Sequence, residues 1–98
     1  NDTSLRERTI VVMEFQKGLV VRSLSGHDKG GFFIILECDS KFAVICDGKR
    51  RTLEKTKKKN LIHLAVTNTV ADEASMQTNR GIRKFLSAFN ADDKEQAL

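Results

Sequence analysis

The sequence predicts a mainly β protein in which five antiparallel strands form a small barrel and one helix follows near the C-terminus. Three observations lead to this fold class. Two apolar runs rich in β-branched residues flank a short glycine-containing loop at 25–31, which is the pattern of a β-hairpin. Asp39-Ser40 and Asp47-Gly48 then supply turn residues between further short runs. Toward the C-terminus the apolar residues recur at helical spacing instead.

The hairpin occupies residues 17–36. Its second run is apolar at five consecutive positions, 32–36. The glycines of loop 25–31 can adopt positive φ, so the chain can turn sharply there. A charged loop on a rigid hairpin is a favourable place for a binding function, and a purely structural turn is the alternative.

We expect five strands, at 18–24, 31–38, 41–46, 51–54 and 61–64. The core candidates on them are Ile34, Leu36, Val44 and Ile45. Because the run 32–36 does not alternate with polar residues, both of its faces need cover. We therefore expect an element outside the barrel to pack on it.

An amphipathic helix is expected at 79–89, with Asn79 as its N-cap and a helical turn before it within 70–77. Its apolar stripe has i, i+3, i+4, i+7 spacing and consists of Ile82, Phe85, Leu86 and Phe89. The stripe either packs on the barrel or docks on another protein or a second copy.

At 98 residues the chain is expected to form one domain. Residues 1–12 are expected to be a flexible N-terminal extension or an expression remnant, since Met13 could be a natural start. Residues 13–66 would form the barrel, and residues 67–98 a helical extension that packs on it.

The hairpin resembles the KOW motif of ribosomal proteins and transcription elongation factors. The resemblance depends on Gly-Leu-Val-Val at 18–21, Gly-His-Asp-Lys-Gly at 26–30 and the apolar run 32–36, which follow in the order of the motif. As far as Leu64 the chain is similar to the small KOW-containing RNA-binding proteins of bacteria, which are related to eukaryotic-type large-subunit ribosomal proteins. The resemblance implies an SH3-like barrel, RNA (above all ribosomal RNA) as partner, and a role in translation. His27 stands where related loops often carry arginine.

Positive charge is concentrated in one segment. The net charge is +4, yet segment 48–60 alone holds seven basic residues and one acidic residue. This is the electrostatic footprint that binding to a polyanion requires, although a basic run can also be a solvated surface. We expect contacts to an RNA backbone from Arg22, His27, Lys29, Gly30, Lys49, Arg50, Arg51, Lys55, Lys57, Lys58 and Lys59. The backbone N–H groups of Gly30 and Gly31 are expected to contribute as well.

Recognition by shape and backbone fits this composition better than stacking on bases, because the chain has no Trp or Tyr. Among its phenylalanines, Phe42 is the candidate for an exposed aromatic ring, although such a residue is more often part of the core. The alternative function is a protein-interaction module in translation or transcription, with ribosomal proteins as possible partners.

Other functions find little support in the sequence. His27 and His63 are the only histidines, and neither has a nucleophile or carboxylate at motif spacing, so we expect no enzyme activity. We expect no metal and no cofactor. Cys38 and Cys46 would lie beyond disulfide reach and are expected to be free thiols in a reducing compartment, the cytoplasm. No apolar run approaches the roughly 18 residues of a membrane-spanning helix, and no secretion signal is evident.

Overall fold

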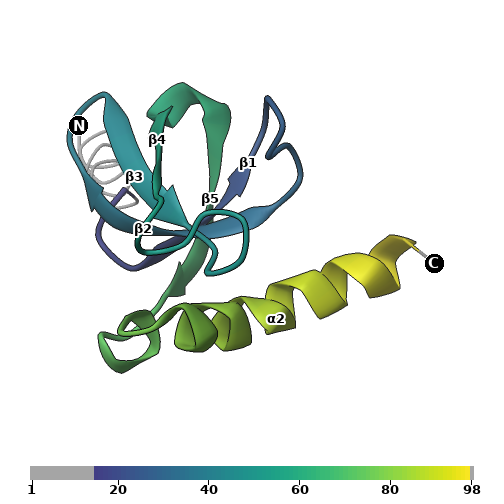
Figure 1. The fold of residues 1–98 in the computed structure, drawn as a ribbon. Helices are drawn as coiled ribbons and strands as arrows, with labels where there is room; N and C mark the ends of the chain where they lie inside the picture. Colours follow the sequence, from purple (N-terminus) through teal and green to yellow (C-terminus); the bar gives the residue numbers. More distant parts are fainter. Residues whose placement is uncertain (1–14, 98) are drawn as a thin grey trace, which may run out of the picture.

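A computed structural model describes residues 15–97 as a curved antiparallel sheet with one long helix beneath it (Figure 1). The strands are β1 (Leu19–Ser23), β2 (Phe32–Cys38), β3 (Phe42–Cys46), β4 (Lys57–Asn60) and β5 (Leu64–Val70). They lie in the order β4-β3-β2-β1-β5, with every neighbouring pair antiparallel. The 3-10 turn η1 (Leu61–His63) joins β4 to β5, and a second, η2 (Ala74–Met76), precedes the helix α2 (Asn79–Ala97). The mainly β class with a C-terminal helix is confirmed, whereas the predicted segment 1–12 lies outside the described residues.

Three strands were predicted to within one residue at each end, and two predictions were wrong. Residues 51–54 form part of the connection between β3 and β4, because the side-chain Oδ1 of Asp47 accepts the N–H groups of Lys49 and Arg51 and coils the chain. The fourth strand lies at Lys57–Asn60 instead. The expected strand at 61–64 begins as η1, where the side chain of Asn60 accepts the N–H of Ile62 at 3.0 Å.

Each face of the sheet buries its own apolar cluster. Val20 and Val21 are both completely buried, yet they belong to different clusters because successive strand residues point to opposite faces. The cluster on the concave face consists of Leu19, Val21, Phe33, Ile35, Ala43, Ile45 and Leu64. The cluster on the other face consists of Val20, Ile34, Cys46, Ala71, Met76, Ile82 and Leu86. The apolar run 32–36 therefore needs cover on both faces, as expected. Of the predicted core residues, Ile34 and Ile45 are fully buried, while Leu36 and Val44 are half-buried.

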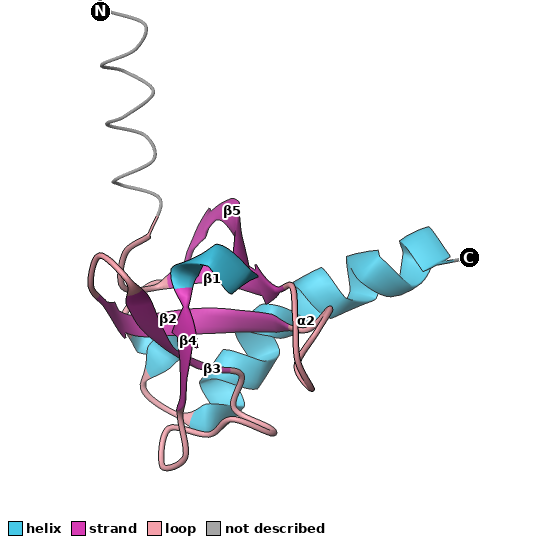
Figure 2. Cartoon of the chain, turned by 90° about the horizontal axis from the view of Figure 1, so that it is seen from above, coloured by secondary structure: helices cyan, strands magenta, loops and turns pink. Residues whose placement is uncertain are grey.

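Helix α2 provides the cover for the second face (Figures 1 and 2). Ile82 and Leu86 are buried against the sheet, and the ring of Phe89 lies 5.3 Å from that of Phe32. The predicted stripe thus packs within the chain. Thr78 caps the helix, since its Oγ1 accepts the N–H of Gly81 at 2.9 Å; the prediction that Asn79 is the cap was wrong. No helix in the described part of the chain is long and apolar enough to cross a membrane.

The sheet curls strongly. Lys59 on β4 donates a hydrogen bond to the hydroxyl of Ser23 on β1, although β3 and β2 lie between these strands in the sheet. Register shifts between β2 and β3 and between β1 and β5 mark irregular pairing, which bends strands. The curl brings the loop between β1 and β2 close to β4 and to the β3–β4 connection.

Candidate nucleic-acid interface

The β1–β2 loop is a tight turn in which backbone N–H groups donate to nearby carbonyl groups of the same hairpin. Gly26 and Gly30 have left-handed backbone conformations, with φ of 76° and 88°. The N–H of Gly30 donates to the carbonyl of Ser23 at 2.8 Å, and that of Gly31 donates to the carbonyl of Asp28 at 3.0 Å. The expectation that these two amides meet phosphate oxygens is therefore corrected, since both are already engaged within the loop.

Asp28 ties this loop to the basic segment. Its side chain is only 4% exposed, and its Oδ2 accepts a hydrogen bond from Nη2 of Arg51 at 3.0 Å. Arg51 was predicted to contact RNA, but its guanidinium serves first as the partner of a buried carboxylate. This ion pair joins residues 23 positions apart and sets the two predicted halves of the site side by side.

Lys59 makes a second tie between the same regions. Its residue is 9% exposed, and its Nζ donates to Ser23 Oγ at 2.8 Å and to the carbonyl of Ser25 at 2.6 Å. An ammonium group has three donors, and two of them are used here. The structure therefore places this predicted RNA contact inside the protein, where it anchors the start of the β1–β2 loop.

The β3–β4 connection is held from its other side by helix α2. Arg83 Nη1 donates to the carbonyl of Gly48 at 2.6 Å. Asn79 accepts the N–H of Leu53 at 2.8 Å and donates to the carboxylate of Glu54 at 2.9 Å. Gly48 has φ of 75°, and Asn79 approaches it so closely that a Cβ there would lie 2.3 Å from the Asn79 carbonyl oxygen. The first turns of the helix thus fix the loop that carries most of the basic residues.

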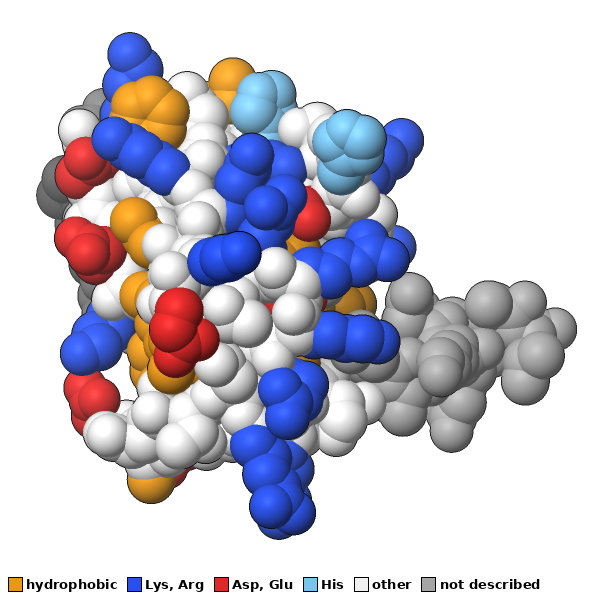
Figure 3. Space-filling model, in the orientation of Figure 1, with side chains coloured by type: hydrophobic (Ala, Val, Ile, Leu, Met, Phe, Trp, Pro, Cys, Tyr) orange, Lys and Arg blue, Asp and Glu red, His pale blue; other side chains and the backbone are white. Residues whose placement is uncertain are grey.

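The exposed cations surround these two tied loops. Arg22 lies on β1 beside these loops and is exposed, and its Nη2 lies 4.0 Å from where a Cβ on Gly30 would stand. The other exposed members of the predicted site in the two loops are His27, Lys29, Lys49, Arg50 and Lys55. Figure 3 shows Lys and Arg side chains gathered over the centre and right of one face, while Asp and Glu lie mainly toward its left edge. We call the exposed set Arg22, Lys29, Lys49, Arg50 and Lys55 the loop cations.

The remaining lysines of β4 are not part of that group. Lys57 is half-buried, and Lys58 points to the opposite face from Lys59, as strand alternation requires. The Nζ of Lys58 lies 4.8 Å from the ring centroid of Phe42, and that of Lys41 lies 5.7 Å from it. Lys58 therefore belongs to a separate patch on the convex face of β3 and β4.

Sequence reasoning missed the residues that position the cations. No role in the site was predicted for Asp28, and Asn79 was predicted only as the N-cap of the helix. No role was predicted for Arg83 either. The one usable signal was the Asp47-Gly48 turn, which indicates a bend but not the helix residues that pack on it.

The titratable groups offer little chemistry beyond charge. Burial raises the pKa of the Cys46 thiol to about 11, so this thiol stays protonated at neutral pH and is a poor nucleophile. The hydrogen bond from the Asn79 amide lowers the pKa of the Glu54 carboxyl. Both cysteines are free, and the described residues contain no group of three or more side chains that could hold a metal ion.

Comparison with known proteins adds no identification. No family model matches the chain, and no curated protein matches it. Function is therefore inferred from the geometry of the two tied loops and from the resemblance seen in the hairpin.

Proposed function

We propose that this protein binds structured RNA through the sugar-phosphate backbone, using the loop cations at one end of the curved sheet. The observation that carries the proposal is the Arg51–Asp28 ion pair, which holds the β1–β2 loop against the β3–β4 connection. Lys29 and Arg50 are the sequence neighbours of that pair, one from each loop. Cations from two distant parts of the sequence can therefore act on one stretch of phosphates.

The anchoring of the loops is consistent with recognition of a fixed shape. Basic side chains on mobile loops bind phosphates but must be ordered on binding, which costs affinity. Here the bonds of Asp28, Lys59 and Asn79 hold the two loops in position before any ligand arrives. Phosphate contacts of this kind fix position and orientation without reading the base sequence.

The fold supports the same proposal. We infer that the five strands close as an SH3-like barrel of the KOW type, because the bond from Lys59 to Ser23 links β4 to β1 across the concave face. The loop between β1 and β2, with glycines at positive φ, then occupies the place of the KOW loop. By that resemblance we propose ribosomal RNA as the partner and a ribosomal or ribosome-associated role in translation. The protein-interaction alternative keeps only part of its expected surface, since Ile82 and Leu86 are buried against the sheet while Phe85 and Phe89 are half-buried.

Salt titration of a 12-base-pair RNA hairpin tests the proposal. Fluorescence anisotropy of the labelled hairpin should give log K that falls with log salt by roughly 0.7–0.9 per phosphate contacted. Replacing Lys29 and Arg50 together with alanine should weaken binding and reduce that slope by about 1.5. The matched control is Lys17→Ala with Lys84→Ala, which removes the same charge from exposed positions elsewhere.

Two results would contradict the proposal. The wild-type protein could fail to bind the hairpin even at low salt. Alternatively, the two double variants could lose affinity and slope equally, which would show that net charge alone matters and that the tied loops form no site.

A further inference from the structure

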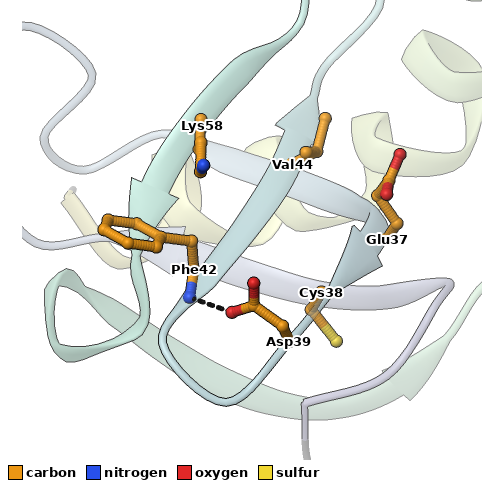
Figure 4. Close-up of a pocket in the computed structure, with 6 residues that line it drawn as sticks. All are labelled: Glu37, Cys38, Asp39, Phe42, Val44 and Lys58. Carbon is orange, nitrogen blue, oxygen red and sulfur yellow. Dashed lines mark hydrogen bonds between the residues drawn. The ribbon is translucent and has the colours of Figure 1, made fainter.

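A shallow hollow opens on the convex face of the sheet, beyond the area that α2 covers (Figure 4). Its volume is about 200 Å³. It is lined by Glu37, Cys38, Asp39, Phe42, Val44 and Lys58. Sites that enclose a whole drug-sized ligand usually measure roughly 300–1,000 Å³, so this hollow has room for one ring system and not for a larger molecule.

The aromatic ring in the hollow is held in place and flanked by cations. The N–H of Phe42 donates to Oδ1 of Asp39 at 2.7 Å, which fixes the backbone at the start of β3. The ammonium groups of Lys58 and Lys41 lie 4.8 Å and 5.7 Å from the ring centroid. Glu37 presents an exposed carboxylate on the other side of the hollow.

We propose that this hollow binds one base of a single-stranded segment adjoining the RNA that the loop cations hold, an inference that rests on the proposed function. The base stacks on Phe42, Lys58 and Lys41 contact the phosphates beside it, and Glu37 accepts a hydrogen bond from an exocyclic amino group. A base can displace the lysines from the ring because aromatic stacking is generally stronger than an exposed cation–π contact.

The position of the hollow requires a single strand rather than a duplex. Phe42 is the first residue of β3, whereas the β3–β4 connection, which carries Lys49 and Arg50, follows the end of that strand. Five residues at about 3.3 Å each separate the two sites by roughly 17 Å. A flexible tail of a few nucleotides spans that distance, while the bases of a duplex are stacked and paired and cannot reach a protein ring.

The charges around the hollow predict how the affinity for the tail depends on salt. Two carboxylates, Glu37 and Asp39, offset the two ammonium groups of Lys41 and Lys58. Stacking must therefore supply most of the affinity at this site. A variant without the aromatic ring should bind the tail less tightly and keep nearly the same salt slope.

The experiment compares the blunt 12-base-pair hairpin with the same hairpin carrying a six-nucleotide adenosine tail. The wild-type protein should bind the tailed RNA roughly 5- to 150-fold more tightly. Phe42→Leu should remove this preference and leave the affinity for the blunt hairpin within about twofold, since it removes the stacking ring alone. Phe42→Tyr should keep the preference, because it retains the ring. Phe85→Leu on α2 is the control and should also keep it.

The outcomes separate this inference from the proposed function. If the wild-type protein binds both RNAs equally, or if Phe42→Leu and Phe42→Tyr behave alike, the stacking site is refuted while backbone binding stands. If Phe42→Leu weakens both RNAs equally and shows altered circular dichroism, Phe42 is a folding residue and the inference also fails. If the wild-type protein binds neither RNA at low salt, the proposed function fails as well.

Discussion

Replacing Gly48 with alanine should disrupt the contact between the basic connection and helix α2. Gly48 has φ of 75°, and a Cβ added there would lie 2.3 Å from the carbonyl oxygen of Asn79 and 3.1 Å from Cγ of Arg83. Gly30 provides a matched control, because its φ of 88° is similar but the nearest atom, Nη2 of Arg22, is 4.0 Å away. The two substitutions therefore impose the same backbone strain and differ in the space around the new methyl group.

The expected magnitudes follow from that difference. A left-handed conformation costs an alanine about 1–2 kcal/mol, and Gly30→Ala should cost no more than this. Gly48→Ala must in addition displace the first turn of α2, with its bonds from Asn79 to Leu53 and Glu54 and from Arg83 to the Gly48 carbonyl. Three such bonds at roughly 0.5–1.5 kcal/mol each raise the total loss to about 2.5–6.5 kcal/mol.

Urea unfolding followed by circular dichroism measures both variants. Gly48→Ala should lower the free energy of unfolding by at least about 1.5 kcal/mol more than Gly30→Ala. Its affinity for the RNA hairpin should also fall under conditions where the protein is folded, because the loop that carries Lys49 and Arg50 has moved. Equal losses for the two variants would refute the reasoning, since they would show that the helix does not hold the connection.

Four further substitutions test the bonds that hold the site together. Arg51→Met leaves the Asp28 carboxylate, 4% exposed, without its partner and should cost about 3–5 kcal/mol in urea unfolding. Asp28→Asn leaves a guanidinium that is 31% exposed and can be hydrated, so it should cost only about 1–3 kcal/mol, and the reverse ranking would contradict the burial argument. Lys59→Met removes a cation bound inside the protein, so the salt slope for the RNA hairpin should stay unchanged, whereas a reduction near 0.7–0.9 would reveal a phosphate contact. Glu54 has a lowered pKa in the folded state, so its contribution to stability is present above the ordinary value of 4.5 and is lost as pH falls through the folded value. Glu54→Gln should therefore flatten the fall in melting temperature between about pH 5 and pH 3, and identical pH profiles would count against it.

The parts of the fold that the sequence predicts well are those governed by local pattern. The strands around 18–24, 31–38 and 41–46 show β-branched residues between turn residues, and all three lie within one residue of their predicted bounds at each end. Strand β4 (Lys57–Asn60) was not predicted, because three consecutive lysines show neither alternation nor apolar character. Lys59 is buried there only because Ser23 and Ser25 accept its hydrogen bonds, and those partners lie more than thirty residues away.

In the candidate site, too, the sequence predicts what local pattern determines and not what long-range partners determine. Composition shows where in the sequence the positive charge lies, but not which group each cation contacts. The cations differ in how far they are buried. Arg51 and Lys59 are as basic in the sequence as Arg50 and Lys49, yet the first two are bonded within the protein and the second two are exposed. A single sequence contains no pattern that separates the two classes, because the distinction depends on the long-range partners.

The bonds of Arg51 and Lys59 within the protein explain how the exposed cations can be held close to one another. Like charges on one connection repel one another, so Lys49, Arg50 and Lys55 alone would favour an extended and mobile loop. The buried carboxylate of Asp28 opposes that repulsion from one side, and the bonds from Asn79 and Arg83 hold the backbone from the other. Helix α2 therefore has two structural roles: its apolar stripe completes the core, and its first two turns brace the loop that carries the charge. Changes at the helix N-terminus that leave every loop cation in place should therefore weaken RNA binding by altering the geometry of the loop.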